Sequence, residues 1–146
     1  MQLSFGYWKK TSSFVFATAI LFSSASAADL PSGLVEKGTQ QWAENNLDGA
    51  QKSFEQAANQ SPKSVEANFK LAGLLLSRND FTGSIRTYQR VIGLDPKHTK
   101  AWLGLGISYM HTGNNELSVA AFEEAIRLDP GRKKQLDPIL INLKKD

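Results

Sequence analysis

Residues 99–132 read TKAWLGLGISYMHTGNNELSVAAFEEAIRLDPGR, and this stretch predicts two helices joined by a turn. In its first half, large residues recur at the i, i+3 and i+7 spacing of one helix face, at Trp102, Leu105 and Tyr109. Residues 112–115, Thr-Gly-Asn-Asn, then interrupt the pattern with residue types that end helices. A second helical pattern follows and stops at an Asp-Pro pair, because proline disfavours a helical conformation in the residue before it. The stretch is therefore a predicted helical hairpin.

The same pattern recurs every 34 residues along the chain. Pro62, Pro96 and Pro130 share this spacing, which is the signature of a repeat protein. The columns in register include the aromatic residues Phe54, Tyr88 and Phe122 and the small residues Gly38, Ala72 and Gly106. Two helices approach closely where one carries a small residue, so an aromatic side chain of the other helix is expected to fill that space. No alternating pattern typical of strands competes between residues 32 and 132, and the sequence predicts an all-α fold.

The repeats resemble those of tetratricopeptide-repeat (TPR) proteins over about 100 of the 146 residues. The match to the family pattern is fullest in the third repeat, at Trp102, Leu105, Gly106, Tyr109, Phe122, Ala125 and Pro130. The resemblance implies a right-handed TPR solenoid of three antiparallel helical hairpins, covering residues 31–64, 65–98 and 99–132. It also implies a protein-binding scaffold without catalytic activity, of the kind that acts in assembly of envelope or secretory complexes.

Residues 133–146 are expected to form a short C-terminal capping helix, because the last hairpin of a solenoid leaves an apolar flank open. We expect Asp137 to cap this helix and Pro138 to be its first residue. Ile139, Leu140 and Leu143 would then face the stack.

The resemblance and helical geometry together predict a binding groove on the first helices of the hairpins. Two columns of the repeat are apolar there, and the column between them is small in the first two repeats. The predicted groove residues are Val35, Trp42, Phe69, Gly73, Leu76, Lys100, Leu103, Ile107, Met110 and His111. Such a groove fits an apolar helical or extended segment of a partner protein. The alternatives are self-association into a homodimer and packing of these residues within the chain.

A different binding mode of the family, a clamp of lysine, asparagine and arginine for a C-terminal carboxylate, is disfavoured. Its five positions are occupied by Val35, Thr39, Lys70, Lys100 and Gly104. Only Lys100 carries the residue that the family uses at its position.

The N-terminus has the order of a secretory signal peptide. Lys9 and Lys10 precede the apolar run 14–22, and the small residues 23–28 offer cleavage after Ala27 or Ala28. We therefore expect a signal peptide at 1–28, a TPR domain at 29–146 and export, most simply to the periplasm. The alternative is an uncleaved signal that anchors the domain to the inner membrane.

The composition argues against nucleic-acid binding, metal binding and catalysis. Cleavage of residues 1–28 would remove two lysines and no acidic residue, so the formal charge of +3 falls to +1 and offers little attraction for nucleic acid. The chain has no cysteine, and His98 and His111 have no partners at metal-ligand spacing. We expect no cofactor, no metal and no enzymatic activity.

Overall fold

The computed structural model describes residues 30–145, and our predictions for the N-terminal signal lie outside these residues. Every regular element within 30–145 is helical, as predicted. The elements are α1 (Pro31–Ala43), α2 (Leu47–Gln60), α3 (Val65–Ser77), α4 (Phe81–Leu94), α5 (Thr99–His111), α6 (Asn115–Leu128), the 3-10 turn η2 (Pro130–Arg132) and α7 (Lys133–Leu143). In this part of the chain no helix is long and apolar enough to cross a membrane.

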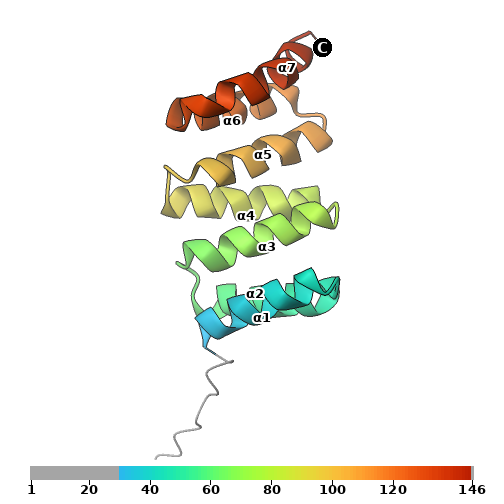
Figure 1. Cartoon of the computed structure of the whole chain (residues 1–146), viewed down its shortest axis with the longest axis vertical. Helices are drawn as coiled ribbons and strands as arrows, with labels where there is room; N and C mark the ends of the chain where they lie inside the picture. Colours follow the sequence, from blue (N-terminus) through green and yellow to red (C-terminus); the bar gives the residue numbers. More distant parts are fainter. Residues whose placement is uncertain (1–29, 146) are drawn as a thin grey trace, which may run out of the picture.

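The helices form three antiparallel hairpins that stack along the long axis of the molecule, with α7 at the C-terminal end (Figure 1). α1 pairs with α2, α3 with α4, and α5 with α6. Successive hairpins meet through α2 with α3 and α4 with α5, and the first helices also contact one another, α1 with α3 and α3 with α5. The predicted solenoid of three hairpins with a terminal helix is confirmed.

The turn inside each hairpin depends on one residue with a left-handed backbone. Asn45, Asn79 and Gly113 have φ angles of 60°, 62° and 74°, and they lie 34 residues apart. Glycine and asparagine adopt this conformation most readily, which explains why these types stand at each turn. The next residue caps the following helix in the first two repeats, through the side chains of Asn46 and Asp80.

The turn between hairpins is held by a side chain of the following helix. The Trp102 indole N–H donates to the carbonyl oxygen of Pro96 over 2.9 Å. One repeat earlier, the amide of Asn68 donates to the carbonyl of Pro62 over 3.1 Å. Asn68 is fully buried and also accepts a hydrogen bond from Arg90, so a polar residue replaces the tryptophan without losing the contact.

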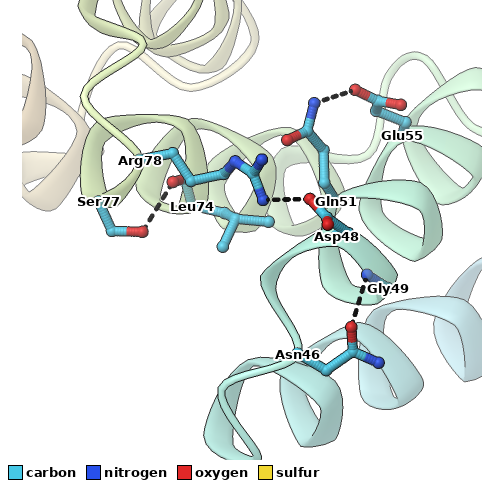
Figure 2. A network of polar contacts seen from close by, with 8 residues as sticks. All are labelled: Asn46, Asp48, Gly49, Gln51, Glu55, Leu74, Ser77 and Arg78. Carbon is cyan, nitrogen blue, oxygen red and sulfur yellow. Dashed lines mark hydrogen bonds and ion pairs between the residues drawn. The ribbon is translucent and has the colours of Figure 1, made fainter.

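An ion pair on the surface joins the first two repeats. A nitrogen of Arg78 lies 2.7 Å from the carboxylate of Asp48, beside the cap that Asn46 gives to Gly49 (Figure 2). The Asp48 side chain is 82% exposed, so the pair contributes at most about 1 kcal/mol to stability. The contact between the first two hairpins therefore rests mainly on apolar packing.

The small-residue column works as predicted in the first and third repeats. The Phe54 ring lies on Gly38 and the Phe122 ring lies on Gly106, and a Cβ at either glycine would lie 2.6 Å from the ring. Both rings are almost completely buried. The glycines therefore set how closely the two helices of these hairpins approach.

The capping helix is present, but our prediction of its start was wrong. α7 begins at Lys133, and Pro138 lies inside it instead of at its first position. The reason is Leu136, which is 4% exposed and packs with Leu140 against Phe122 and the rest of the third core cluster. A helix that began at Pro138 would leave Leu136 outside the helical register, and burying a leucine contributes about 2 kcal/mol.

Candidate binding face

The ten predicted groove residues lie on α1, α3 and α5, and we call the surface that carries them the groove face. Seven are half-buried, namely Trp42, Phe69, Gly73, Leu76, Leu103, Ile107 and Met110. Lys100 and His111 are exposed. Val35 is only 6% exposed and belongs to the first core cluster, so it offers little surface to a partner. Whether the other nine bind anything stays a prediction.

Trp42 links the first two repeats across the groove face. Its ring packs edge-on against Phe54, with 6.2 Å between the ring centroids. The far edge of the indole lies beside Gly73, where an added Cβ would stand 3.4 Å from the nearest Trp42 carbon. The absence of a side chain at Gly73 therefore leaves a low point between the indole and α3.

Phe69 is flanked by two rings. The Tyr88 ring centroid lies 6.0 Å away and the His98 ring centroid 4.6 Å away. His98 also caps α5, because its Nδ1 accepts a hydrogen bond from the backbone N–H of Ala101. Our sequence reasoning gave His98 no role, since its position before a helix is one that Ser, Thr, Asp or Asn usually occupies.

His111 packs against an aromatic ring that the sequence did not single out. Its imidazole stacks on Phe81 with 4.6 Å between centroids and 3° between planes. Phe81 is the first residue of α4, and the contact closes the end of the groove face beside the hairpin turn. An i, i+30 pair of this kind has no signal in helical periodicity.

The C-terminal end of the groove face is partly used by the cap. Leu103 and Ile107 pack against the cluster of Phe122, Leu136 and Leu140. Leu76 packs in the same way against the second core cluster. Met110 belongs to none of the three clusters and is half-buried, so it is the apolar groove residue that contributes least to the packing of the core.

The hydroxyl of Tyr88 extends toward the next hairpin. Ala72 stands where Gly38 and Gly106 stand and shares a core cluster with Tyr88, while one edge of the Tyr88 ring and its hydroxyl lie against Gly104 of the next hairpin. A Cβ at Gly104 would lie 2.5 Å from the Tyr88 hydroxyl oxygen, and a Cβ at Gly73 would lie 3.6 Å from it. The hydroxyl is thus placed between α3 and α5, beside Gly73 and Gly104.

This hydroxyl has no protein partner in the part of the chain that the structure describes. Serine hydroxyls nearby are all satisfied, as Ser84 donates to the Ala72 carbonyl and bonds to Ser108. Tyr88 makes no such bond, and its burial raises the pKa of its phenol to about 12. Since residues 30–145 contain no buried side-chain polar atom without a partner, the Tyr88 oxygen must reach solvent at the groove face.

A second hollow lies on the other side of α5. It encloses about 450 Å3 between α4 and α6, with Trp102, Leu105 and Tyr109 at its base. Leu117, at its edge, is 49% exposed.

No group of three or more His, Asp or Glu residues able to hold a metal ion occurs within 30–145.

Comparison with known proteins finds a matching family model and relatives that are similar over part of their length. The tetratricopeptide-repeat family model matches residues 35–98 and 74–133. Among curated proteins, the general transcriptional corepressor ssn6 of Schizosaccharomyces pombe is 30% identical over 82 residues, or 56% of this chain. The CTR9 homologue of Arabidopsis thaliana is 28% identical over 131 residues, or 88% of this chain. The aligned regions span only 7% and 12% of those proteins.

Solved structures resemble most of the stack. The TPR domain of Arabidopsis OM64 has a TM-score of 0.73 at 19% identity, covering 79% of this chain and 94% of that one. The first TPR domain of Spaghetti (RPAP3), solved with an HSP90 peptide, has a TM-score of 0.74 at 16% identity and covers 83% and 95%. MamA has a TM-score of 0.68 at 22% identity and covers 72% and 61%. At these identities the likeness establishes the fold alone.

Proposed function

We propose that this chain, which belongs to the tetratricopeptide-repeat family, is a non-enzymatic adaptor that holds an apolar segment of a partner protein against the groove face. The observation that carries this proposal is the set of half-buried apolar side chains on α1, α3 and α5. Apolar side chains that remain partly accessible after folding gain free energy when a partner covers them.

Two structural neighbours support a peptide as the occupant. The Spaghetti (RPAP3) domain was solved with an HSP90 peptide and the TPR2B domain of yeast Sti1 with an Hsp70 peptide. The present chain has a different groove chemistry, because Gly104 and Val35 stand at clamp positions and both are buried. We therefore propose recognition of apolar side chains, not of a terminal carboxylate.

We propose that the protein works after export, in assembly of an envelope or secretory complex. The support is the order of positive, apolar and small residues in 1–28. N-terminal sequencing of the protein isolated from cells tests it. A chain that starts after Ala27 or Ala28 supports export of a free domain, and one that keeps Met1 contradicts cleavage and favours a tethered domain.

Binding at the groove face is tested best at Met110, because this side chain lies outside the core clusters. Random 12-residue peptides are displayed and selected on the chain, and each selected peptide is measured against Met110→Glu. The matched control is Leu117→Glu, which changes an exposed leucine on α6. We expect Met110→Glu to weaken binding at least about tenfold while Leu117→Glu leaves it unchanged, since a carboxylate placed in an apolar contact must be desolvated.

Two outcomes contradict the proposal. If no peptide is selected, or if every selected peptide binds both variants as well as the original chain, the groove face is not a peptide site. Light scattering over a range of protein concentrations distinguishes self-association from peptide binding. A dimer that dissociates on Met110→Glu would show that the groove face binds a second copy.

A further inference from the structure

The hydroxyl of Tyr88, a nearly buried residue, lies at the base of the groove face. The residue is 4% exposed and makes no hydrogen bond within residues 30–145, yet its oxygen is not sealed from solvent. It lies between two glycines, Gly73 on α3 and Gly104 on α5, with the Trp42 indole beside Gly73. A polar atom in this position has given up most of its water and has received no protein partner in return.

The sequence around Tyr88 places the hydroxyl there. In the other two repeats the equivalent aromatic residue is phenylalanine and lies on a glycine of its own hairpin. In the second repeat Tyr88 shares a core cluster with Ala72, and Gly104 of the next hairpin leaves room for one edge of the ring and its hydroxyl. Gly104 is needed to admit the ring, whereas Gly73 has room for a methyl group at ordinary contact distance. Gly73 therefore leaves the hydroxyl accessible without being required for packing.

We propose that the Tyr88 hydroxyl donates a hydrogen bond to a backbone carbonyl of an extended peptide segment that crosses the groove face over Gly73. The inference rests on the proposed function and adds the backbone conformation of the bound segment. The carbonyls of a helix are engaged in its own hydrogen bonds, while those of an extended segment are free. A glycine at the contact lets another backbone approach closely.

The acceptor is a neutral carbonyl because of the surroundings. Trp42 and Phe69 flank the site with apolar rings, so a carboxylate would lose its hydration there. The phenol stays protonated throughout the physiological range, since burial raises the pKa of Tyr88 to about 12. It is therefore a permanent donor.

The probes are the selected 12-residue peptides that bind the full chain and are weakened by Met110→Glu. Three variants are compared with each peptide. Tyr88→Phe removes the hydroxyl and keeps the ring, and Gly73→Ala covers the hydroxyl with a methyl group. Gly93→Ala is the control, because an added Cβ there meets nothing within 4 Å and the residue lies on α4. We expect Tyr88→Phe and Gly73→Ala each to weaken binding about 3- to 10-fold, the range of one hydrogen bond, and Gly93→Ala to have no effect.

A second measurement locates the acceptor. Each peptide amide is replaced in turn by an ester, whose carbonyl is a weaker acceptor. One ester is expected to weaken binding to the original chain and to have no further effect in Tyr88→Phe. Peptides that depend on Met110 yet bind Tyr88→Phe with unchanged affinity overturn this inference and leave the proposed function standing. Peptides that are helical when bound, by circular dichroism, overturn it as well. Absence of any Met110-dependent peptide overturns both.

Discussion

Single residues decide how the repeats differ from one another. Gly38 and Gly106 receive the aromatic ring of their own hairpin, and Gly104 receives one ring edge and the hydroxyl of Tyr88 from the preceding hairpin. Glycines thus allow close contacts within two of the repeats and one between the second and third.

Gly104→Ala is expected to destabilise the fold by about 1–3 kcal/mol, the usual cost of overpacking. The reason is that the new methyl group would overlap the Tyr88 ring and its hydroxyl. Urea denaturation followed by circular dichroism measures the change. Gly73→Ala is the control and should stabilise α3 by about 0.5–1 kcal/mol, because alanine favours a helix over glycine. Equal effects at the two glycines would refute the packing described for Tyr88.

Gly113→Ala is expected to cost about 1–2 kcal/mol, since its φ of 74° lies in the left-handed region. Gly113→Asn should cost less than half as much. Asparagine occupies the same turn position at Asn45 and Asn79 with nearly the same angle. Denaturation midpoints of the two variants give the comparison, and a larger loss for asparagine than for alanine would contradict it.

The raised pKa of Tyr88 is expected to lower the free energy of unfolding at high pH. Its pKa is about 12 in the folded chain and about 10 when unfolded, so between these values the unfolded state has released a proton that the folded state retains. The stabilisation is complete below pH 10 and is lost as pH rises through 12, in total about 2–3 kcal/mol. Other groups titrate here, so the difference between the original chain and Tyr88→Phe is measured from pH 8 to 11. A difference that does not change with pH would contradict the burial of the phenol.

At the scale of elements, α7 shows how packing overrides a local signal. Asp137-Pro138 is a good helix start, yet the helix begins at Lys133 so that Leu136 and Leu140 share one buried face. Pro138 then lacks the N–H that would bond to the carbonyl four residues earlier.

Pro138→Ala is therefore expected to stabilise the chain by about 1–2 kcal/mol. This is less than the full cost of an interior proline, because alanine also raises the conformational entropy of the unfolded chain. Leu140→Ala, in contrast, should destabilise by about 2–4 kcal/mol by opening a cavity beside Phe122. Thermal and urea unfolding measure both. A destabilising Pro138→Ala would mean that the helix does begin at the proline.

In the whole molecule, the 34-residue period was enough to predict three hairpins and their order, and the open apolar flank of the last hairpin predicted the terminal helix. It succeeded because each repeat carries the same marks, such as Phe54 and Phe122 over their glycines. It could not show that Val35 is buried, or that Leu103 and Ile107 are shared with the cap, because these contacts join different hairpins. The contact of the Tyr88 hydroxyl with Gly104 could not be predicted either, since it depends on space left by a glycine in the next repeat.

We propose that the face of α1, α3 and α5 binds an extended apolar segment, and amide chemical-shift mapping of the chain with a selected peptide locates the bound segment. We predict that the largest shifts fall on Gly73, Gly104 and Met110, around the Tyr88 hydroxyl and the apolar groove residues. Shifts confined to Gly93, Leu117 and other residues of α4 and α6 away from Tyr88 would show that the groove face does not bind the peptide.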